Sequence, residues 1–248
     1  MPAVRQACYN SFMISVIIPA YNEEKKIGEC LSSLVNQSTA QKFEVIVVDN
    51  NSKDKTAEIA RQYENKLNLK IIVQKIKGRG AARQKGFHQA KGEIMLSTDA
   101  DAIIPPSWIE KFSKSLQESN TVAITGTCRI TDCGFFTNTI FNVFQPLFMR
   151  IYRLIFGHYW LSGFSFGIYK DAYKKSGGFN KNLNVQEDID LSFRVSKIGQ
   201  IKFIPNLPVI FSGRRFKNGL LKGLLTYVTT FIGYFYYKNK KVILSDIR

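Results

Sequence analysis

Continuous apolar runs alternate with amphipathic stretches over the first hundred residues of the chain. The apolar runs are rich in β-branched side chains and predict buried strands at residues 14–20, 43–49, 69–76 and 93–99. Helical spacing of apolar side chains predicts intervening helices at residues 23–36, 54–63 and 80–90. Asn22 is the expected N-cap of the first helix. This alternation is typical of a mostly parallel sheet wrapped by helices, which binds ligands at the carboxyl ends of its strands.

The second half of the chain is less regular. Strands are predicted at residues 121–130 and 200–205, and a helix at residues 188–198. Pro146 interrupts a long aromatic segment, residues 134–161. The expected fold is therefore α/β, with a Rossmann-like, mostly parallel central sheet flanked by helices.

A further apolar stripe lies near the C-terminus. One helical face is formed by Leu220, Leu221, Leu224, Leu225, Val228, Phe231, Ile232 and Phe235. Lysines and tyrosines flank this face, as on helices that lie on an anionic membrane. Packing on the rest of the chain, or pairing with a second copy of it, is an equally open interpretation. The stripe is too polar to be a membrane span.

Charge adds a further constraint. The chain has 35 Lys and Arg against 19 Asp and Glu, an excess of 16 positive charges. Residues 191–248 hold eleven of the basic residues and a single acid, Asp246. Such an excess indicates an anionic partner, which is a nucleic acid, a phosphorylated substrate or an anionic membrane.

The cysteines give no sign of a metal or disulfide framework. They are Cys8, Cys30, Cys128 and Cys133, with no CxxC pair and no histidine at zinc spacing. Reduced thiols and an N-terminus without a signal-peptide pattern favour a cytoplasmic protein, placed on the cytoplasmic face of the membrane if the C-terminal stripe binds lipid.

Two carboxylates, Asp99 and Asp101, follow the strand predicted to end at residue 99. Spaced two apart on a loop, they can share Mn²⁺ or Mg²⁺ and leave coordination positions open for phosphate oxygens. A solvated acidic turn has the same short pattern, so the pair alone does not identify a metal site.

Two other loops fall at the same edge of the sheet. After the first strand, Pro19, Tyr21 and Glu23 offer an aromatic face and a carboxylate. After the second, the segment from Asp49 to Asn51 is rich in groups that can hold a base and ribose. Each loop on its own is a weak indication.

A basic, glycine-containing turn precedes the helix predicted at residues 80–90. Lys77, Arg79 and Arg83 combine cations with the backbone N–H groups of a helix start, a combination suited to a diphosphate. The turn is neither a Walker loop nor a full GxGxxG fingerprint.

Glu187 and Asp188 begin the helix predicted near residue 188. Acids at a helix start commonly complement the helix dipole. If they face a bound diphosphate instead, one of them can deprotonate an acceptor hydroxyl.

Taken in order and spacing, these segments resemble the family-2 glycosyltransferases of the GT-A fold. The matching segments are VIIPAYNEE (16–24), VDNNSKDKT (48–56), GRGAARQKG (78–86), TDAD (98–101), SGGF (176–179) and EDIDLSFR (187–194). The resemblance covers residues 14–215. It implies inverting transfer of a hexose from a UDP- or GDP-linked donor to a glycan or lipid-linked acceptor, at a hydroxyl or phosphate, with Mn²⁺ or Mg²⁺ as cofactor.

The resemblance also assigns roles to residues. Nucleoside contacts fall to Pro19, Tyr21, Glu23 and Asp49, and the diphosphate to Arg79 and Arg83. Asp99 and Asp101 are expected to bind the metal. Glu187 and Asp188 are the expected catalytic pair, with Asp188 as general base. The acceptor side is expected to be lined by Gly163, Gly178 and Phe179.

The sequence departs from the family pattern at two places. The common VDDGS motif is replaced by Asp49-Asn50-Asn51-Ser52, which weakens the base and ribose assignment. No QxxRW motif follows Asp188, which argues against a processive synthase. Arg214 and Arg215 stand there instead, either as a solvated basic turn or as a clamp for an acceptor phosphate.

These assignments divide the chain into three parts. Residues 1–12 form an N-terminal extension, residues 13–215 a catalytic domain and residues 216–248 an amphipathic helical segment. Within the domain, residues 13–101 are expected to bind the nucleotide and residues 102–215 the acceptor.

Two rival functions remain. A sugar-nucleotide pyrophosphorylase would need a glycine-rich loop directly after the first strand, where Pro19 to Glu23 stand instead. A basic nucleic-acid-binding module would fit the charge, although the chain has no zinc finger or RNP-like stretch and no nucleic-acid partner is expected.

Overall fold

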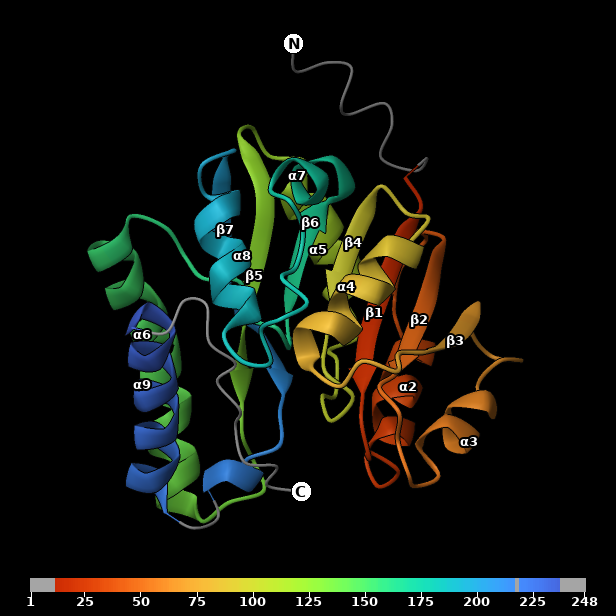
Figure 1. Cartoon of the computed structure of the whole chain (residues 1–248), viewed down its shortest axis with the longest axis horizontal. Helices are drawn as coiled ribbons and strands as arrows, with labels where there is room; N and C mark the ends of the chain where they lie inside the picture. Colours follow the sequence, from red (N-terminus) through yellow and green to blue (C-terminus); the bar gives the residue numbers. More distant parts are fainter. Residues whose placement is uncertain (1–11, 217–218, 237–248) are drawn as a thin grey trace.

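The computed structural model describes residues 12–216 and 219–236, which leaves most of the expected N-terminal extension and the end of the C-terminal segment outside the described residues. A seven-stranded sheet with the order β3-β2-β1-β4-β6-β5-β7 forms the centre (Figure 1). The strands are β1 (Ile14–Ala20), β2 (Phe43–Asp49), β3 (Leu69–Val73), β4 (Ile94–Ser97), β5 (Thr121–Arg129), β6 (Phe166–Tyr169) and β7 (Gln200–Ile210). Within this sheet, only β6 runs antiparallel to its neighbours, β4 and β5. The prediction of a mostly parallel α/β sheet is confirmed.

Helices cover both faces of this sheet. They are α2 (Ile27–Val35), α3 (Thr56–Arg61), α4 (Arg79–Gln89), α5 (Trp108–Leu116), α6 (Phe135–Phe156), α7 (Lys170–Lys175), α8 (Glu187–Val195) and α9 (Leu220–Tyr236), with a 3-10 turn η1 (Arg214–Phe216) before α9. Successive side chains of a strand point to opposite faces, so Val16 and Ile18 lie in one core and Ile17 in the other. Helices α2 and α5 contribute to the first core, and α4, α7 and α8 to the second.

Two local expectations are wrong. Asn22 does not cap a helix, because α2 begins only at Ile27 and is preceded by Lys26, which makes no side-chain cap. Asn22 has a φ of 52°, and its Oδ1 accepts a hydrogen bond from Lys53 N at 2.9 Å, so it joins the loops after β1 and β2 instead. Pro146 does not interrupt the aromatic segment, because α6 runs through it.

Helices α6 and α9 lie side by side at the end of the molecule away from β3 (Figure 1). Their aromatic side chains meet, with the ring centroids of Phe156 and Phe235 6.0 Å apart. The expected C-terminal helix is therefore present and packs beside α6. Among the described helices, none combines the length and the apolar character needed to cross a membrane.

The strand order places the site at the carboxyl edge of β1. β1 pairs with β2 on one side and β4 on the other, and Ala20 stands opposite Asp49 in the register. Neighbouring loops diverge where the strand order reverses, and this opening is where open α/β sheets bind their ligands.

Candidate active site

Three segments bring five carboxylates to this edge of the sheet. They are Glu23 after β1, Asp99 and Asp101 after β4, and Glu187 and Asp188 at the start of α8. Two arginines, Arg83 of α4 and Arg214 of η1, hold these segments together. The two acidic motifs singled out in the sequence are thus parts of one network.

Arg83 links the two acidic motifs directly. It is 2% exposed, and its Nη2 donates to Asp99 Oδ1 at 2.6 Å while its Nη1 donates to Glu187 Oε1. A buried guanidinium needs acceptors, and these bonds fix both carboxylates in place. The sequence placed Arg83 at the donor diphosphate, whereas the structure directs its terminal nitrogens at carboxylates.

Arg214 makes a second link, between the loops after β1 and β4. Its Nη2 donates to Asp101 Oδ2 at 2.6 Å and to Glu23 Oε1 at 2.7 Å. The sequence placed Arg214 and Arg215 on the acceptor side. Arg214 instead contacts two residues assigned to the donor and metal, and the Arg215 guanidinium lies 5.4 Å from the ring centroid of Tyr227 on α9.

Backbone N–H groups orient Asp188. Gly163 N donates to its Oδ2 and Ile189 N to its Oδ1, both at 2.9 Å. A Cβ atom on Gly163 would lie 2.8 Å from Arg83 Cζ, closer than such atoms approach, so a side chain here would displace the Arg83 guanidinium from its ion pairs. The site therefore depends on the backbone of the loop before β6.

Burial and mutual repulsion shift the ionisation of these acids. Burial raises the pKa of Asp101 to about 7, with Arg214 opposing and Asp99 adding to the shift. Burial likewise raises the pKa of Glu187 to about 7, with Arg83 opposing and Asp188 adding to it. Five carboxylates against two arginines leave 5 − 2 = 3 excess negative charges when all are ionised. This excess suits a site that binds a cation.

The loop after β1 contacts the turn before α4, and Asp49 closes the loop after β2. Lys77 Nζ lies 4.7 Å from the ring centroid of Tyr21, which joins two residues predicted to bind the donor. Asp49 Oδ1 accepts a hydrogen bond from Ser52 N at 3.0 Å, and this bond turns the loop after β2. Asn51 follows Asn50 in that loop with a φ of 65°.

Asn50 is a positioning residue that the sequence interpretation missed. Its Nδ2 donates to Gln74 O at 2.8 Å and Ile76 O at 2.7 Å, and its Oδ1 accepts from Gly78 N at 2.8 Å. These bonds hold the loop that carries Lys77. The departure from VDDGS at this position was the available signal, because an amide donates and accepts at once whereas a carboxylate only accepts.

The remaining predicted residues lie around this centre. Pro19 lies in β1, and Arg79 begins α4, where its N donates to Asn184 Oδ1 at 3.1 Å. Gly178 has a φ of +67°. Phe179 is 1% exposed and packs in the second core, while its N donates to Tyr173 OH and its carbonyl accepts from Gln84 Nε2, both at 3.1 Å, so it does not line the acceptor side as expected.

Curated relatives match part of the chain. Glycosyltransferase AglE of Haloferax volcanii is 36% identical over 121 residues, which are 48% of this chain and 40% of that protein. Dolichol-phosphate mannosyltransferase of Pyrococcus furiosus is 36% identical over 112 residues, 45% of this chain and 32% of that protein. The chain therefore matches less than half the length of these relatives.

Solved structures match more of the chain. Staphylococcus aureus TarS 1-349 in complex with UDP-GlcNAc has a TM-score of 0.65 and 25% identity, over 81% of this chain and 58% of that one. Mannosyltransferase PcManGT of Pyrobaculum calidifontis, in complex with GDP-Man and Mn²⁺, has a TM-score of 0.66 and 22% identity, over 88% of this chain and 64% of that one. The second likeness shows the fold alone.

A family model provides the assignment for most of the described fold. The model for glycosyl transferase family 2 matches residues 15–177, from β1 to the turn after α7. This chain belongs to glycosyl transferase family 2 and has the GT-A fold.

Proposed function

We propose that this chain transfers a hexose, with inversion, from a nucleotide-diphospho-sugar to an acceptor hydroxyl or phosphate. The observation that carries the proposal is the Arg83 bridge, which joins Asp99 on the donor side to Glu187 beside the candidate base. The TarS complex with UDP-GlcNAc supports a nucleotide-sugar donor. The match to family 2 favours this function over a pyrophosphorylase or a nucleic-acid-binding module.

The donor fits the edge formed by the loops after β1, β2 and β4. Tyr21, Asp49 and Asn51 offer an aromatic ring and polar groups for the base and ribose. Lys77 and Arg79 supply positive charge near the start of α4. We assign the diphosphate to these two cations.

Asp99 and Asp101 would hold Mn²⁺ or Mg²⁺. Burial raises the pKa of Asp101, and the neighbouring carboxylates Asp99 and Glu23 add to the shift; a bound ion would relieve this repulsion. Among the described residues, no three acidic, histidine or cysteine side chains are arranged to hold a metal by themselves. The other ligands would come from phosphate oxygens and water, as is usual for Mg²⁺. When bound, the ion supplies positive charge that stabilises the departing diphosphate.

Asp188 acts as the general base. Glu187 is occupied by Arg83, whereas Asp188 is held only by backbone N–H groups in the contacts described above. An acceptor hydroxyl oxygen attacks the anomeric carbon as its proton passes to Asp188; an ionised phosphate oxygen would attack without this proton transfer. The bond from that carbon to the phosphate oxygen breaks, and the nucleoside diphosphate leaves with the electron pair. A single displacement of this kind inverts the anomeric centre.

The test is release of nucleoside diphosphate from a panel of UDP- and GDP-hexoses, with and without EDTA. We expect turnover with one donor class, loss of turnover with EDTA, and loss of at least about 100-fold in both Asp99→Asn and Asp188→Asn. Asp188→Asn should retain donor binding by calorimetry, whereas Asp99→Asn should weaken it. Full activity in Asp188→Asn would contradict the role of that residue.

A further inference from the structure

Helices α6 and α9 present apolar side chains to solvent along one continuous stripe each. On α9 the exposed residues are Leu221, Leu225, Val228, Ile232 and Phe235. On α6 they are Phe135, Phe136, Ile140, Val143, Phe144, Leu147, Phe148, Ile151, Leu154 and Ile155. Leu154 is 85% exposed and Leu221 is 72% exposed. We call these fifteen residues the apolar face.

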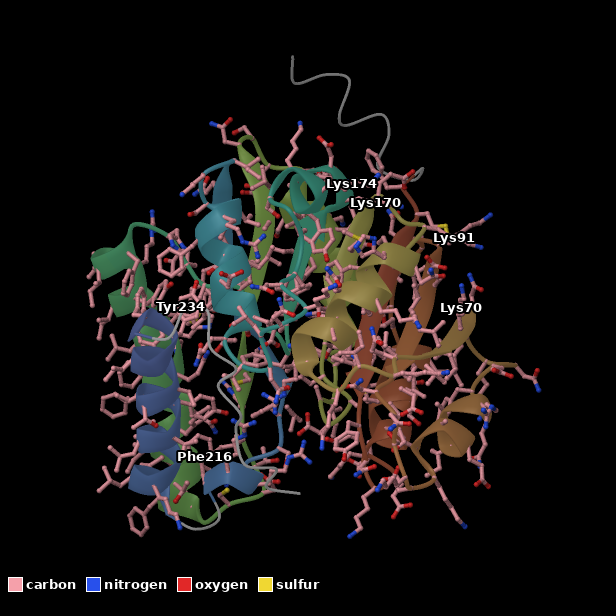
Figure 2. All side chains as sticks on the ribbon, viewed as in Figure 1. Lys70, Lys91, Lys170, Lys174, Phe216 and Tyr234 are labelled. Carbon is pink, nitrogen blue, oxygen red and sulfur yellow. The ribbon has the colours of Figure 1, made fainter. Side chains whose placement is uncertain are left out.

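The inner side of α9 makes both polar and aromatic contacts with the rest of the chain. Thr230 and Tyr234 are buried, and both bond to the segment around α8. Gln186 Nε2 donates to Thr230 Oγ1 at 3.1 Å, and Tyr234 OH donates to Asp190 Oδ1 at 3.0 Å. Tyr234 lies on α9 beside α6 in Figure 2. These contacts fix which side of α9 faces the domain and leave Leu221 and Leu225 on the exposed side.

Charge indicates what covers the apolar face. Arg150, Arg153 and Lys222 are exposed on the two helices, and neither helix contains Asp or Glu. A symmetric pair of copies would bring these like charges together. An anionic lipid surface instead complements them while accepting the leucines and phenylalanines.

We infer that the apolar face of α6 and α9 lies on an anionic membrane surface, with both helices parallel to it. Since neither helix is able to span a bilayer, the face enters the headgroup region without crossing. Because α9 contacts the segment that carries Asp188, an acceptor anchored in the same membrane would approach the base from this side. That last step rests on the proposed function, whereas membrane binding does not.

The test is flotation of the full chain with vesicles, without donor or metal. We compare pure phosphatidylcholine with equal parts phosphatidylcholine and phosphatidylglycerol, and expect binding to the anionic vesicles that weakens with salt. The double variant Leu154→Asp/Leu221→Asp should lower binding at least about tenfold. Arg150→Glu/Lys222→Glu should lower it by a similar factor.

Val73→Asp is the matched control, because Val73 is 51% exposed and belongs to β3 at the other end of the sheet. It should float like the unmodified chain. Thermal melting checks that the variants are folded.

Three results would overturn the inference. One is no flotation with either vesicle, and another is unchanged flotation of the Leu154→Asp/Leu221→Asp variant. The third is a dimer by light scattering that this variant converts to a monomer, since a second copy would then cover the face. Failure of glycosyl transfer alone would leave vesicle binding unaffected.

Discussion

Arg214 Nη2 lies 2.6 Å from Asp101 Oδ2, although the two residues are 113 positions apart in the chain. The same guanidinium contacts Glu23, so it joins the loop after β1 to the loop after β4. Asp101 and Glu23 are both almost fully buried, and each forms a described ion pair with Arg214. Arg214 therefore holds together the two loops that we propose bind the donor and its metal ion.

Arg214→Ala should destabilise the chain, because it takes the guanidinium away from two buried carboxylates. Arg214 is partly exposed, so we expect a loss of about 2 kcal/mol in the free energy of unfolding. For a chain of this size the loss corresponds to about 6 °C in Tm. Adding Mn²⁺ should raise the Tm of this variant by more than it raises the Tm of the unmodified chain, since the ion replaces the missing positive charge. Thermal melting with and without Mn²⁺ measures both effects.

Arg215→Ala is the control for that experiment. Arg215 is the next residue, yet its guanidinium stacks on Tyr227 and has no described ion pair. Its Tm should change by much less. Equal Tm values for the two variants would contradict the role given to Arg214.

Gly163→Ala should impair catalysis through Arg83. The added Cβ would lie 2.8 Å from Arg83 Cζ, and Arg83 is held between two carboxylates. The guanidinium must move, and the base must move with the loop that orients it. A displacement of about 1 Å in such a site can lower kcat by about 100-fold. Steady-state kinetics measure this loss.

Gly134→Ala provides the comparison, because a Cβ at Gly134 has no atom within 4 Å among the described residues. This variant should keep the kcat of the unmodified chain. If Gly163→Ala kept it as well, Arg83 would not need its present position for catalysis.

As the pH is lowered, kcat/KM should begin to fall at a higher pH than it would if the base had the ordinary pKa of an aspartate. Burial raises the pKa of Asp188 above 3.8, with Asp99 adding to the shift and Arg83 and two backbone N–H groups opposing it. A base works only when it is deprotonated, so kcat/KM should drop as pH falls through this raised pKa. The pH profile of kcat/KM measures the acid limb, and circular dichroism at each pH separates it from unfolding.

Glu187 and Asp101 are competing sources of that limb, because the pKa of each is raised to about 7. Glu187→Gln should lower kcat through Arg83 and yet retain an acid limb. A profile in Glu187→Gln that is flat down to pH 3.8, the ordinary pKa of aspartate, would assign the acid limb to Glu187 and contradict the raised pKa of Asp188.

The strands were the most predictable part of the fold. β1 and β2 have the predicted bounds, because each is an uninterrupted buried run that ends at the polar edge of the sheet. β6 was not predicted. It is four residues long and runs against its neighbours, and neither property leaves a pattern in the sequence. The final strand, β7, continues past Pro205 to Ile210, where the pairing with β5 contains irregularities.

The sequence indicated that the acidic motifs lie together at one edge of the sheet, but it did not indicate which side chains contact one another there. The acidic motifs stand at strand and helix ends, which local pattern places at one edge. Arg83 and Glu187 are 104 positions apart, and long side chains have many rotamers, so their pairing depends on how α4 and α8 pack. The sequence therefore indicated Arg83 for the donor diphosphate and Arg214 for an acceptor phosphate, whereas in the structure both arginines form ion pairs with carboxylates.

Thr230 and Tyr234 should tether α9 to the segment that carries Asp188. Thr230→Val/Tyr234→Phe removes their hydroxyls, which bond to Gln186 and Asp190 on either side of Asp188. Each bond contributes about 1 kcal/mol, so local opening of α9 should increase about 30-fold. Limited proteolysis under conditions of rapid reclosing measures this opening. Thr229→Val is the matched control, since the Thr229 hydroxyl bonds only to carbonyls of its own helix in the described contacts. Equal cleavage rates in the two variants would mean that packing of the aromatic side chains alone holds α9 in place.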